Sequence, residues 1–465
     1  MQKPRTLGEL EKQGYQVLSV KQEMRQNLIA NLSRKETLFP GIVGYDQTVI
    51  PQIVNAILAG QDIIFLGERG QAKTRIIRSL VNFLDEEVPV IDGSEVNDNP
   101  FDPISMYGRQ IVSERGAATP IAWLGRAQRY GEKLATPDVT TADLIGEIDP
   151  IKVAEGRYLS DELVIHYGLI PRTNRGIFAI NELPDLSEKI QVGLFNIMEE
   201  RDLQIRGFKI RLPLDVYIVA SANPEDYTNR GRIITPLKDR YGAQIRTHYP
   251  KQIDIEINIM DAERSPILAS DGYRITVPQF MKEIIAETTS MAREHADINQ
   301  RSGVSVRMSI ANYESMIGNA LRRTILLRED EVVPRISDLA SILPSSTGKI
   351  ELETVEEGKE GQIIEELIKK AVKKVFGKHF RSEDFASFLQ NFTSSRSLEV
   401  SDTMPTAVYG QKVRGMGGIH EALQRLEMLE SPAMMASALE FILEGLHLNK
   451  KLNKKVLEGE ISYWG

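Results

Sequence analysis

The chain contains no cysteine. This absence excludes disulfide bonds, thiolate metal ligands and cysteine nucleophiles, and it is typical of proteins from a reducing compartment. None of the six histidines stands in an H-x-x-x-H pattern or at another ligand spacing. We therefore expect no transition metal bound by protein side chains.

Long apolar runs are also missing. No segment approaches the ~18 consecutive apolar residues that a membrane helix needs. Residues 1–20 contain no apolar core of signal-peptide length. We therefore expect a soluble, cytoplasmic protein without a membrane partner.

The composition is that of a globular protein with a large core. Of the 465 residues, 42% are apolar and 26% are charged, which predicts two or three folded units. The net charge is −8, and the sequence contains neither a helix-turn-helix motif nor a platform of aromatic and basic residues. We therefore expect no nucleic-acid partner.

Apolar periodicity divides the chain into four segments. Residues 1–38 form a helical lead-in, and residues 39–255 alternate short β-rich runs with helical patterns, as in a parallel sheet between helices. The clearest strands are 63–66, 88–91, 176–180 and 216–220. Residues 256–345 are helical, and 346–465 form a linker and a helical C-terminal extension, with Lys454 and Lys455 on a solvated helix face. The stretch 100–139 is interpreted as an insertion, most simply a surface loop.

A glycine-containing loop follows the predicted strand 63–66 directly. Its sequence is Gly67-Glu68-Arg69-Gly70-Gln71-Ala72-Lys73-Thr74, and a helical pattern opens at its end. Loops of the type G-x-x-x-x-G-K-[ST] bind phosphates through inward N–H groups, with the lysine on the β- and γ-phosphates and the hydroxyl on Mg²⁺. Ala72 replaces the second glycine with the smallest side chain. The loop therefore predicts a site for ATP and Mg²⁺.

Asn181 and Glu182 end the predicted strand 176–180. In ATP hydrolysis a first carboxylate at such a strand end holds metal-bound waters, and a second orients or deprotonates the attacking water. Glu182 is the candidate general base. Asn181 stands where an aspartate is expected, and it brings no negative charge. We expect weaker Mg²⁺ retention or slower turnover, not loss of nucleotide binding.

Asn223 follows the predicted strand 216–220, in the sequence Ser221-Ala222-Asn223-Pro224. A polar side chain at the tip of a neighbouring strand can hydrogen-bond the attacking water or the γ-phosphate, which gives Asn223 a role as sensor. A turn built by Asn-Pro accounts for the same residue types. Both interpretations stay open at this point.

The ordered set of motifs resembles the MoxR and magnesium-chelatase I-subunit branch of the AAA+ ATPases. Further segments carry the resemblance: Ile42-Val43-Gly44, 140–149, 154–156, 168–170, 174–176, 203–207, 211–213 and Leu237-Lys238-Asp239-Arg240-Tyr241-Gly242. It covers residues 39–343. It implies an α/β AAA+ P-loop core over 39–255 and an all-α lid over 256–345. The extension beyond has no counterpart in the short chelatase subunit.

The resemblance also implies roles for single residues. ATP and Mg²⁺ are the implied cofactors. The implied nucleotide contacts are Val43, Gly44, Gly67, Glu68, Arg69, Gly70, Gln71, Ala72, Lys73, Thr74 and Arg75. The implied catalytic residues are Glu182, Asn223, Arg240 and Arg307, and the implied metal-side residues are Thr74 and Asn181, acting through ATP and waters. Arg240 would be the arginine finger of a neighbouring subunit, with Arg230 and Arg232 as competitors, and Arg307 the sensor-2 arginine of the lid.

A finger supplied by a neighbour implies a homo-oligomeric ring, expected to be a hexamer. Three functions are consistent with the sequence. The first is a chaperone or motor that remodels a partner protein, for which a von Willebrand A domain protein is one candidate. The second is the motor subunit of a metal chelatase acting on a tetrapyrrole, and the third is a nucleotide-gated scaffold with little turnover because of Asn181. The unmatched extension and Asn181 count against the second, and Glu182, Asn223 and Arg240 against the third.

Overall fold

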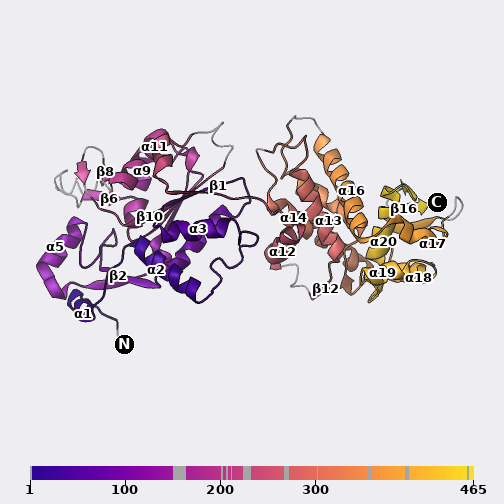
Figure 1. Cartoon of the computed structure of the whole chain (residues 1–465), viewed down its shortest axis with the longest axis horizontal. Helices are drawn as coiled ribbons and strands as arrows, with labels where there is room; N and C mark the ends of the chain where they lie inside the picture. The colour runs from indigo at the N-terminus through magenta and orange to yellow at the C-terminus, as the bar shows by residue number, and fades with distance from the viewer. Residues whose placement is uncertain are drawn as a thin grey trace. The chain divides into compact units, whose positions relative to one another are not determined.

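The computed structural model describes residues 3–149, 164–200, 203–205, 208–210, 212–223, 232–266, 272–300, 302–353, 358–392, 397–457 and 460–465. The chain divides into two units, residues 1–248 and 249–465, each with its own secondary structure (Figure 1). We call them unit 1 and unit 2.

Short apolar runs build the central sheet of unit 1. The strands are β1 (Ile63–Leu66), β4 (Tyr130–Leu134), β7 (Gly176–Asn181), β10 (Val216–Ala222) and β11 (Ala243–Arg246). They lie in the order β11-β1-β10-β7-β4, and every neighbouring pair is parallel. The carboxyl ends of β1, β10 and β7 therefore lie side by side at one edge, where ligands bind in open α/β sheets.

Both faces of the sheet are buried. Ile64, Phe178 and Ile218 face the helices α9 (Glu188–Glu200) and α11 (Thr235–Arg240). The alternate residues Ile63 and Ile177 face α2 (Val20–Ser33), α3 (Val49–Leu58) and α4 (Lys73–Ser79), and Figure 1 shows α9 and α11 on one side and α2 and α3 on the other. Each apolar side chain buried in this way contributes about 1.5–3 kcal/mol, so the sequence forms a sheet between two helical layers, as predicted.

The N-terminal segment is integrated into unit 1. Helix α1 spans Leu7–Lys12, and α2 begins with a capping box between Ser19 and Gln22. Glu23 of α2 is buried and binds Arg129 through two hydrogen bonds of 2.6 Å each. The lead-in is therefore fastened to the core by a buried ion pair.

The predicted strand 88–91 lies outside the central sheet. It is β2 (Glu87–Ile91), which pairs antiparallel with β3 (Ile121–Gly125) in a two-stranded sheet. The expectation of a place in the parallel sheet is wrong, and Pro89 gives the reason, because proline has no N–H to donate in a central ladder. The interpretation of 100–139 as a surface loop is wrong as well. This stretch contains α5 (Met106–Arg115), β3 and β4, and β4 extends the central sheet.

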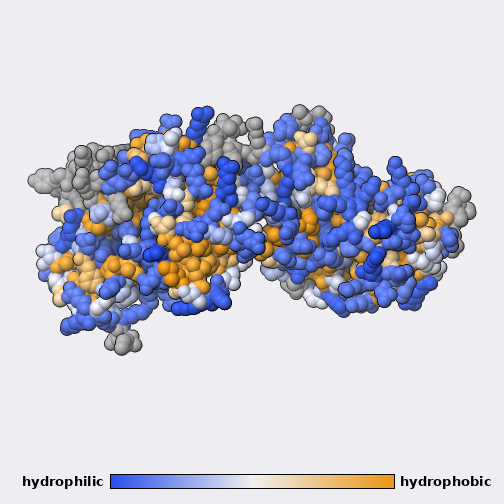
Figure 2. Space-filling view, in the orientation of Figure 1, coloured by the Kyte–Doolittle hydropathy of each residue, from blue (hydrophilic) through white to orange (hydrophobic). Residues whose placement is uncertain are grey.

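The other α-helices and strands within the described part of unit 1 are small. They are α6 (Thr141–Leu144), β5 (Gly146–Ile148), β6 (Ile165–Tyr167), α8 (Leu169–Arg172), β8 (Leu203–Ile205) and β9 (Phe208–Ile210). Strands β5 and β6 form one antiparallel pair, and β8 and β9 another. Figure 2 shows polar side chains over most of the visible surface, with an apolar area on unit 1 in the region of α2 and α3.

Unit 2 is mainly helical. Its helices are α12 (Ile253–Glu263), α13 (Gln279–Ala292), α14 (Val306–Leu327), α15 (Leu343–Thr347), α16 (Lys359–His379), α17 (Ala386–Leu389), α18 (Thr406–Arg414), α19 (His420–Arg425) and α20 (Pro432–Leu448). A short parallel pair joins β12 (Arg274–Ile275) to β13 (Glu331–Val332). Phe280 and Phe441 stack in the core with ring centroids 4.3 Å apart. Among the described residues, no helix is long and apolar enough to cross a bilayer.

A small antiparallel sheet ends the chain. It consists of β14 (Leu398–Ser401), β15 (Asn453–Leu457) and β16 (Glu460–Trp464) in the order β14-β16-β15. Lys454 and Lys455 lie on β15, so their expected place on a helix face is wrong. In a strand these neighbours point to opposite faces, and Lys454 turns inward to form an ion pair with Glu444 at 2.7 Å. The extension is therefore helical with a terminal sheet.

Candidate functional site

The phosphate-type loop lies between β1 and α4, as expected. Gly67 follows β1 and is packed so closely that a Cβ there would lie 1.9 Å from Oγ1 of Thr247. Gly70 has φ +75°, a backbone conformation that favours glycine. Ala72 adopts the left-handed conformation as well, with φ 56° and ψ 14°, immediately before α4 begins. The loop thus keeps a glycine-type backbone at the position where alanine replaces glycine.

Lys73 points into the interior of this loop. Its side chain is only 7% exposed, and Nζ donates to the carbonyl oxygens of Gly67 and Glu68, the latter at 2.9 Å. Nζ also donates to Oδ1 of Asn223 at 2.6 Å. The ammonium group is therefore held at the centre of the loop, where its charge attracts an anionic ligand.

Asn223 connects the loop to the acidic strand end. While Oδ1 binds Lys73, Nδ2 donates to Oε2 of Glu182 at 3.0 Å. Glu182 follows β7 with φ 57°, a left-handed conformation. Non-glycine residues with positive φ cluster at functional sites. The structure thus brings Lys73, Asn223 and Glu182 together, three residues that sequence analysis named separately.

Asn181 lies beside a carboxylate that sequence analysis missed. Nδ2 of Asn181 donates to Oε1 of Glu132 at 2.6 Å, and Oδ1 accepts from the hydroxyl of Ser221 at 3.2 Å. Glu132 lies on the neighbouring strand β4. Burial would raise the pKa of Glu132, but hydrogen bonds and charge from Arg78, with hydrogen bonds from Tyr130 and Asn181, outweigh burial and lower this pKa below its usual 4.5. Glu132 therefore favours the ionised form.

The segment 42–44 is tied to the loop through the residue that follows it. The hydroxyl of Tyr45 lies 2.8 Å from the carbonyl oxygen of His248 and 3.0 Å from that of Gln71, so its single hydrogen is shared between these two acceptors. Burial raises the pKa of this phenol to about 12. Val43 and Gly44 are half-buried, and Gly44 has φ +84°. Tyr45 thus holds the predicted adenine-side segment against the loop, a role that its sequence position gave no reason to expect.

The other predicted loop contacts differ in exposure. Nε2 of Gln71 donates to Oε2 of Glu68 at 2.8 Å, and Oε1 of Gln71 accepts from Oγ1 of Thr247 at 2.6 Å. Thr74 is half-buried at the start of α4. Arg69 and Arg75 are exposed. Gln71 therefore fixes the loop through its side-chain hydrogen bonds, whereas Arg69 and Arg75 are exposed to solvent.

Arg240 is the last residue of α11. Nε of Arg240 forms an ion pair with Glu199 of α9 at 2.7 Å, and the guanidinium lies 5.4 Å from the ring centroid of Phe195. Its side chain is 37% exposed. Arg232 is also exposed. A partly exposed arginine on α11 is compatible with a contact to another molecule.

Arg307 belongs to unit 2. It is the second residue of α14, is exposed, and its backbone N–H donates to Oγ of Ser305, the N-cap, at 3.1 Å. Some predicted features lie outside the described residues. They are Arg230, Pro224, the segment 154–156, and residues 206, 207 and 211 of the predicted hairpin.

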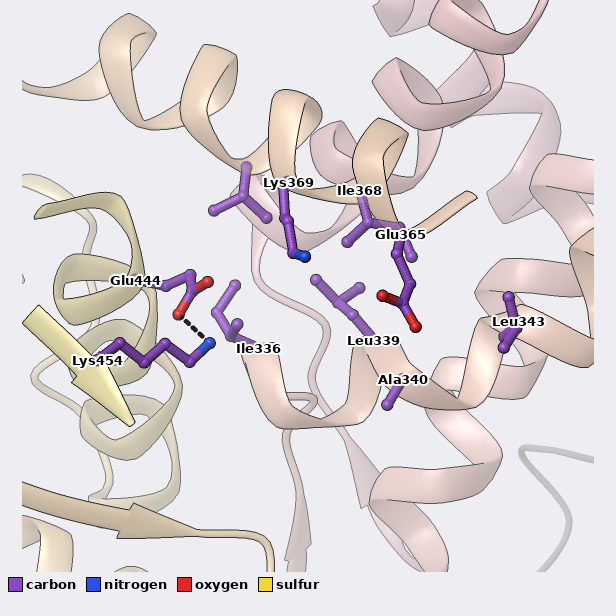
Figure 3. Close-up of a pocket in the computed structure, with 10 residues that line it drawn as sticks. Ile336, Leu339, Ala340, Leu343, Glu365, Ile368, Lys369, Glu444 and Lys454 are labelled. Carbon is purple, nitrogen blue, oxygen red and sulfur yellow. Dashed lines mark hydrogen bonds and ion pairs between the residues drawn. The ribbon is translucent and has the colours of Figure 1, made fainter. Parts of the chain in front are cut away.

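A cavity of about 310 Å³ lies in unit 2. Figure 3 shows that Glu444 and Lys454 face each other on one side of it, while Glu365 and Lys369 project from α16. Ile336, Leu339 and Ile368 supply apolar wall. It contains none of the residues that sequence analysis assigned to the site.

Comparisons with known proteins point to one group. The chain is 23% identical over 325 residues to the magnesium-chelatase subunit ChlI-1 of Arabidopsis thaliana, a match that covers 66% of this chain and 72% of that protein. It is 23% identical over 380 residues to the subunit ChlI of Synechocystis, which covers 76% of this chain and 99% of that protein. No family model matches the chain.

Solved structures give a weaker likeness. The complex between BchI and BchD of magnesium chelatase matches with 18% identity and a TM-score of 0.35, covering 71% of this chain and 98% of that chain. Because this TM-score is low, the relationship rests on the sequence relatives and on the ordered motifs of the site. On that basis the chain is similar to magnesium-chelatase I subunits, and its ordered motifs resemble those of the MoxR and magnesium-chelatase I-subunit branch of the AAA+ ATPases.

Proposed function

We propose that the chain binds ATP with Mg²⁺ at the carboxyl edge of the central sheet and hydrolyses it as a subunit of a ring. The observation that carries the proposal is the position of Asn223, which binds Lys73 through one side-chain atom and Glu182 through the other. A cation in a phosphate-type loop and a candidate base are thereby held in one hydrogen-bonded group. Phosphoryl transfer to water uses both a cation on the phosphates and a residue that orients the attacking water.

The residues present fit both cofactors. The close approach at Gly67 leaves no room for a side chain in the cradle. The candidate metal-side groups are the hydroxyl of Thr74 and the amide oxygen of Asn181. Both are oxygen donors, the type that Mg²⁺ prefers.

Each residue of the group has a defined task in the proposed reaction. Bound ATP and Mg²⁺ supply the reactive phosphoanhydride and the positive charge that offsets its negative charge. Lys73 binds the phosphate oxygens, and Glu182 orients and deprotonates the attacking water. Asn223 fixes the carboxylate of Glu182 and the ammonium of Lys73 relative to each other. Arg240 of a neighbouring subunit and Arg307 of the lid bind the γ-phosphate.

We further propose that the ring is a hexamer in the cytoplasm that remodels or activates a partner protein, with a von Willebrand A domain protein as one candidate. Two alternatives have specific support. The relatives named as magnesium-chelatase subunits favour a motor acting on a tetrapyrrole, which a metal-insertion assay with partner subunits tests. Asn181 in place of an acidic residue favours a nucleotide-gated scaffold with little turnover.

Steady-state Mg²⁺-dependent ATP turnover tests the proposal. We expect turnover by the wild type and a loss of about 100-fold or more in Glu182→Gln, because a general base contributes about 10²–10⁴-fold. Lys73→Ala should lose ATP binding, measured by calorimetry. Glu188→Gln is the matched control, since Glu188 is an exposed residue of α9, and its rate should equal that of the wild type.

The outcomes separate the functions. A wild type that does not bind ATP contradicts the proposal as a whole. A wild type that binds ATP without turnover, while Lys73→Ala does not bind it, supports the scaffold. Turnover that survives in Glu182→Gln removes Glu182 from the role of base.

A further inference from the structure

Glu132 is placed on the same face of the sheet as Asn181. Strands β4 and β7 are parallel, with Glu132 opposite Ala179 and Leu134 opposite Asn181. Since residues two apart in a strand share a face, the side chains of Glu132 and Asn181 point to the same side. Ala179 belongs to the cluster that packs against α4, the helix that begins at Lys73. Glu132 therefore faces the helix that follows the phosphate loop.

The hydrogen bonds around Asn181 fix which way its amide points. The hydroxyl of Ser221 accepts from the backbone N–H of Glu182 at 3.3 Å, so its single hydrogen is free to be donated. It donates to Oδ1 of Asn181 at 3.2 Å, which leaves Nδ2 to donate to Glu132 at 2.6 Å. An aspartate at position 181 would have no hydrogen to give, and it would face the Glu132 carboxylate as a second anion.

Arg78 connects Glu132 to helix α4, the helix that begins at Lys73 in the phosphate loop. Arg78 of α4 binds both carboxylate oxygens of Glu132, at 2.8 and 3.0 Å. Thr74 and Arg78 are four residues apart, so they are neighbours on one helix face with Cβ atoms about 5–6 Å apart. The side chain of Arg78 is 63% exposed and that of Glu132 is 20% exposed. Solvent therefore screens the cation more than the anion, so Arg78 does not fully cancel the negative charge of Glu132.

We propose that Glu132 supplies, through Asn181, the negative charge that an aspartate at position 181 would bring to the Mg²⁺ side of the site. In this arrangement the acidic group lies on the neighbouring strand β4. Asn181 connects this group to the Mg²⁺ side of the site, because its Nδ2 donates to Glu132 while its Oδ1 lies on the other side of the amide. Glu132 is thus a positioning residue that acts through Asn181. The inference rests on the proposed binding of ATP with Mg²⁺.

The test is the ratio of ATP affinities measured by calorimetry with Mg²⁺ and with EDTA. Mg²⁺ should raise the affinity of the wild type, and Glu132→Gln should reduce this ratio about 10-fold, the low end of the effect of removing a residue that supports a metal ligand. ATP affinity in EDTA should not change. The double variant Glu132→Gln/Asn181→Asp should restore the ratio, because it returns the carboxylate to the strand end and retains a donor at position 132.

The single variant Asn181→Asp provides an independent readout. Two carboxylates in contact repel each other, and no hydrogen lies between them to bridge the 2.6 Å contact that Asn181 makes with Glu132. Asn181→Asp should therefore be less stable than the wild type at pH 7, measured by urea unfolding. The double variant, which has a donor at position 132, should regain most of this stability.

Each result has a defined meaning. Wild type that binds no ATP even in EDTA overturns the proposed function, and this inference with it. ATP binding with a Mg²⁺ ratio that Glu132→Gln leaves unchanged overturns the inference alone. If Glu132→Gln does not fold, the comparison of Asn181→Asp with the double variant decides: equal unfolding midpoints of these two variants at pH 7 overturn the placement of charge at Glu132.

Discussion

Lys73 and Asn223 lie on different elements of unit 1, yet Nζ of the first and Oδ1 of the second are 2.6 Å apart. Lys73 opens α4, and Asn223 directly follows β10. The contact exists because β1 and β10 are neighbours in the parallel sheet, so the segments that leave their carboxyl ends meet. The two contacts of the Asn223 amide, with Lys73 and with Glu182, support the proposed sensor role of Asn223.

Asn223→Asp should impair both binding and turnover. The new carboxylate would place a negative charge beside Lys73 and weaken the attraction between the ammonium group and the phosphates of ATP. It would also lose the N–H that binds Glu182 and place two carboxylates in contact. We expect a loss of about 100-fold in kcat and weaker ATP binding, measured by turnover and calorimetry. Asn55→Asp, at an exposed position of α3, is the control. Unchanged kcat in Asn223→Asp would show that the amide is not part of the reacting group.

Glu23→Ala should strongly destabilise unit 1. Glu23 receives two hydrogen bonds from Arg129, which is 1% exposed, and one from the backbone N–H of Asp85 at 2.6 Å. Removing one partner of a buried ion pair leaves an uncompensated charge and costs about 3–5 kcal/mol. Urea unfolding followed by the fluorescence of Trp123, which lies in unit 1 on β3, measures this loss.

The control for Glu23 is an exposed pair. Arg34 and Glu36 lie 3.5 Å apart with side chains 68% and 49% exposed. Exposed pairs contribute about 0–1 kcal/mol, so Glu36→Gln should leave the unfolding midpoint nearly unchanged. Equal effects of Glu23→Ala and Glu36→Gln would contradict the view that the N-terminal helices are fastened by the buried pair.

The sequence predicts those parts of the fold and site whose signals are local. The phosphate loop is one continuous segment flanked by a strand and a helix, so Lys73 and Thr74 could be placed before the structure was seen. Strand 216–220 was recognisable because it is apolar throughout, as strands buried on both faces are. The expectation for Glu182 and Asn223 as strand-end residues follows from the same patterns.

Contacts between distant segments could not be predicted in this way. Glu132 and Asn181 are 49 residues apart, and their pairing depends on β4 joining the sheet at its edge. The sequence of β4, Tyr-Gly-Glu-Lys-Leu, has no apolar run or regular alternation that would distinguish an edge strand from a loop. The link between Glu23 and Arg129 spans 106 residues. Both depend on tertiary packing, which overrides local propensity.

Glu283→Gln should destabilise unit 2 in a pH-dependent manner. Glu283 of α13 binds Lys378 at 2.6 Å and His379 at 2.8 Å, both on α16. Burial would raise the pKa of Glu283, but hydrogen bonds and charge from His379 and Lys378 outweigh it and lower the pKa below its usual 4.5. A carboxyl with a lowered folded pKa contributes stability above its unfolded pKa, and this contribution is lost as pH falls through the folded pKa.

The difference in unfolding free energy between wild type and Glu283→Gln should therefore be present at pH 7 and shrink as the pH falls below about 4. Urea unfolding followed by Trp464, which lies in β16 of unit 2, provides the measurement. Glu366→Gln is the control, because Glu366 forms a solvent-exposed pair with Lys370 one helical turn away, and it should change stability little at either pH. A pH-independent difference for Glu283→Gln would contradict the assigned charge interaction.

Arg240 can be tested as a finger by mixing inactive subunits. Arg240→Ala should lower turnover about 10³-fold or more if it contacts the γ-phosphate of a neighbour, whereas Arg232→Ala should not. Arg240→Ala subunits would then be mixed 1:1 with Glu182→Gln subunits. In a head-to-tail ring an interface regains activity where the Arg240→Ala subunit supplies intact Glu182 and its Glu182→Gln neighbour supplies intact Arg240. Random assembly gives about one quarter such interfaces, so turnover should return to about that fraction of wild type. Glu199→Gln removes the ion-pair partner that Arg240 has within its own chain. Adding this change to the mixed subunits should not alter the turnover that the mixture regains. A mixture as inactive as its two components would assign Arg240 to a role within its own subunit.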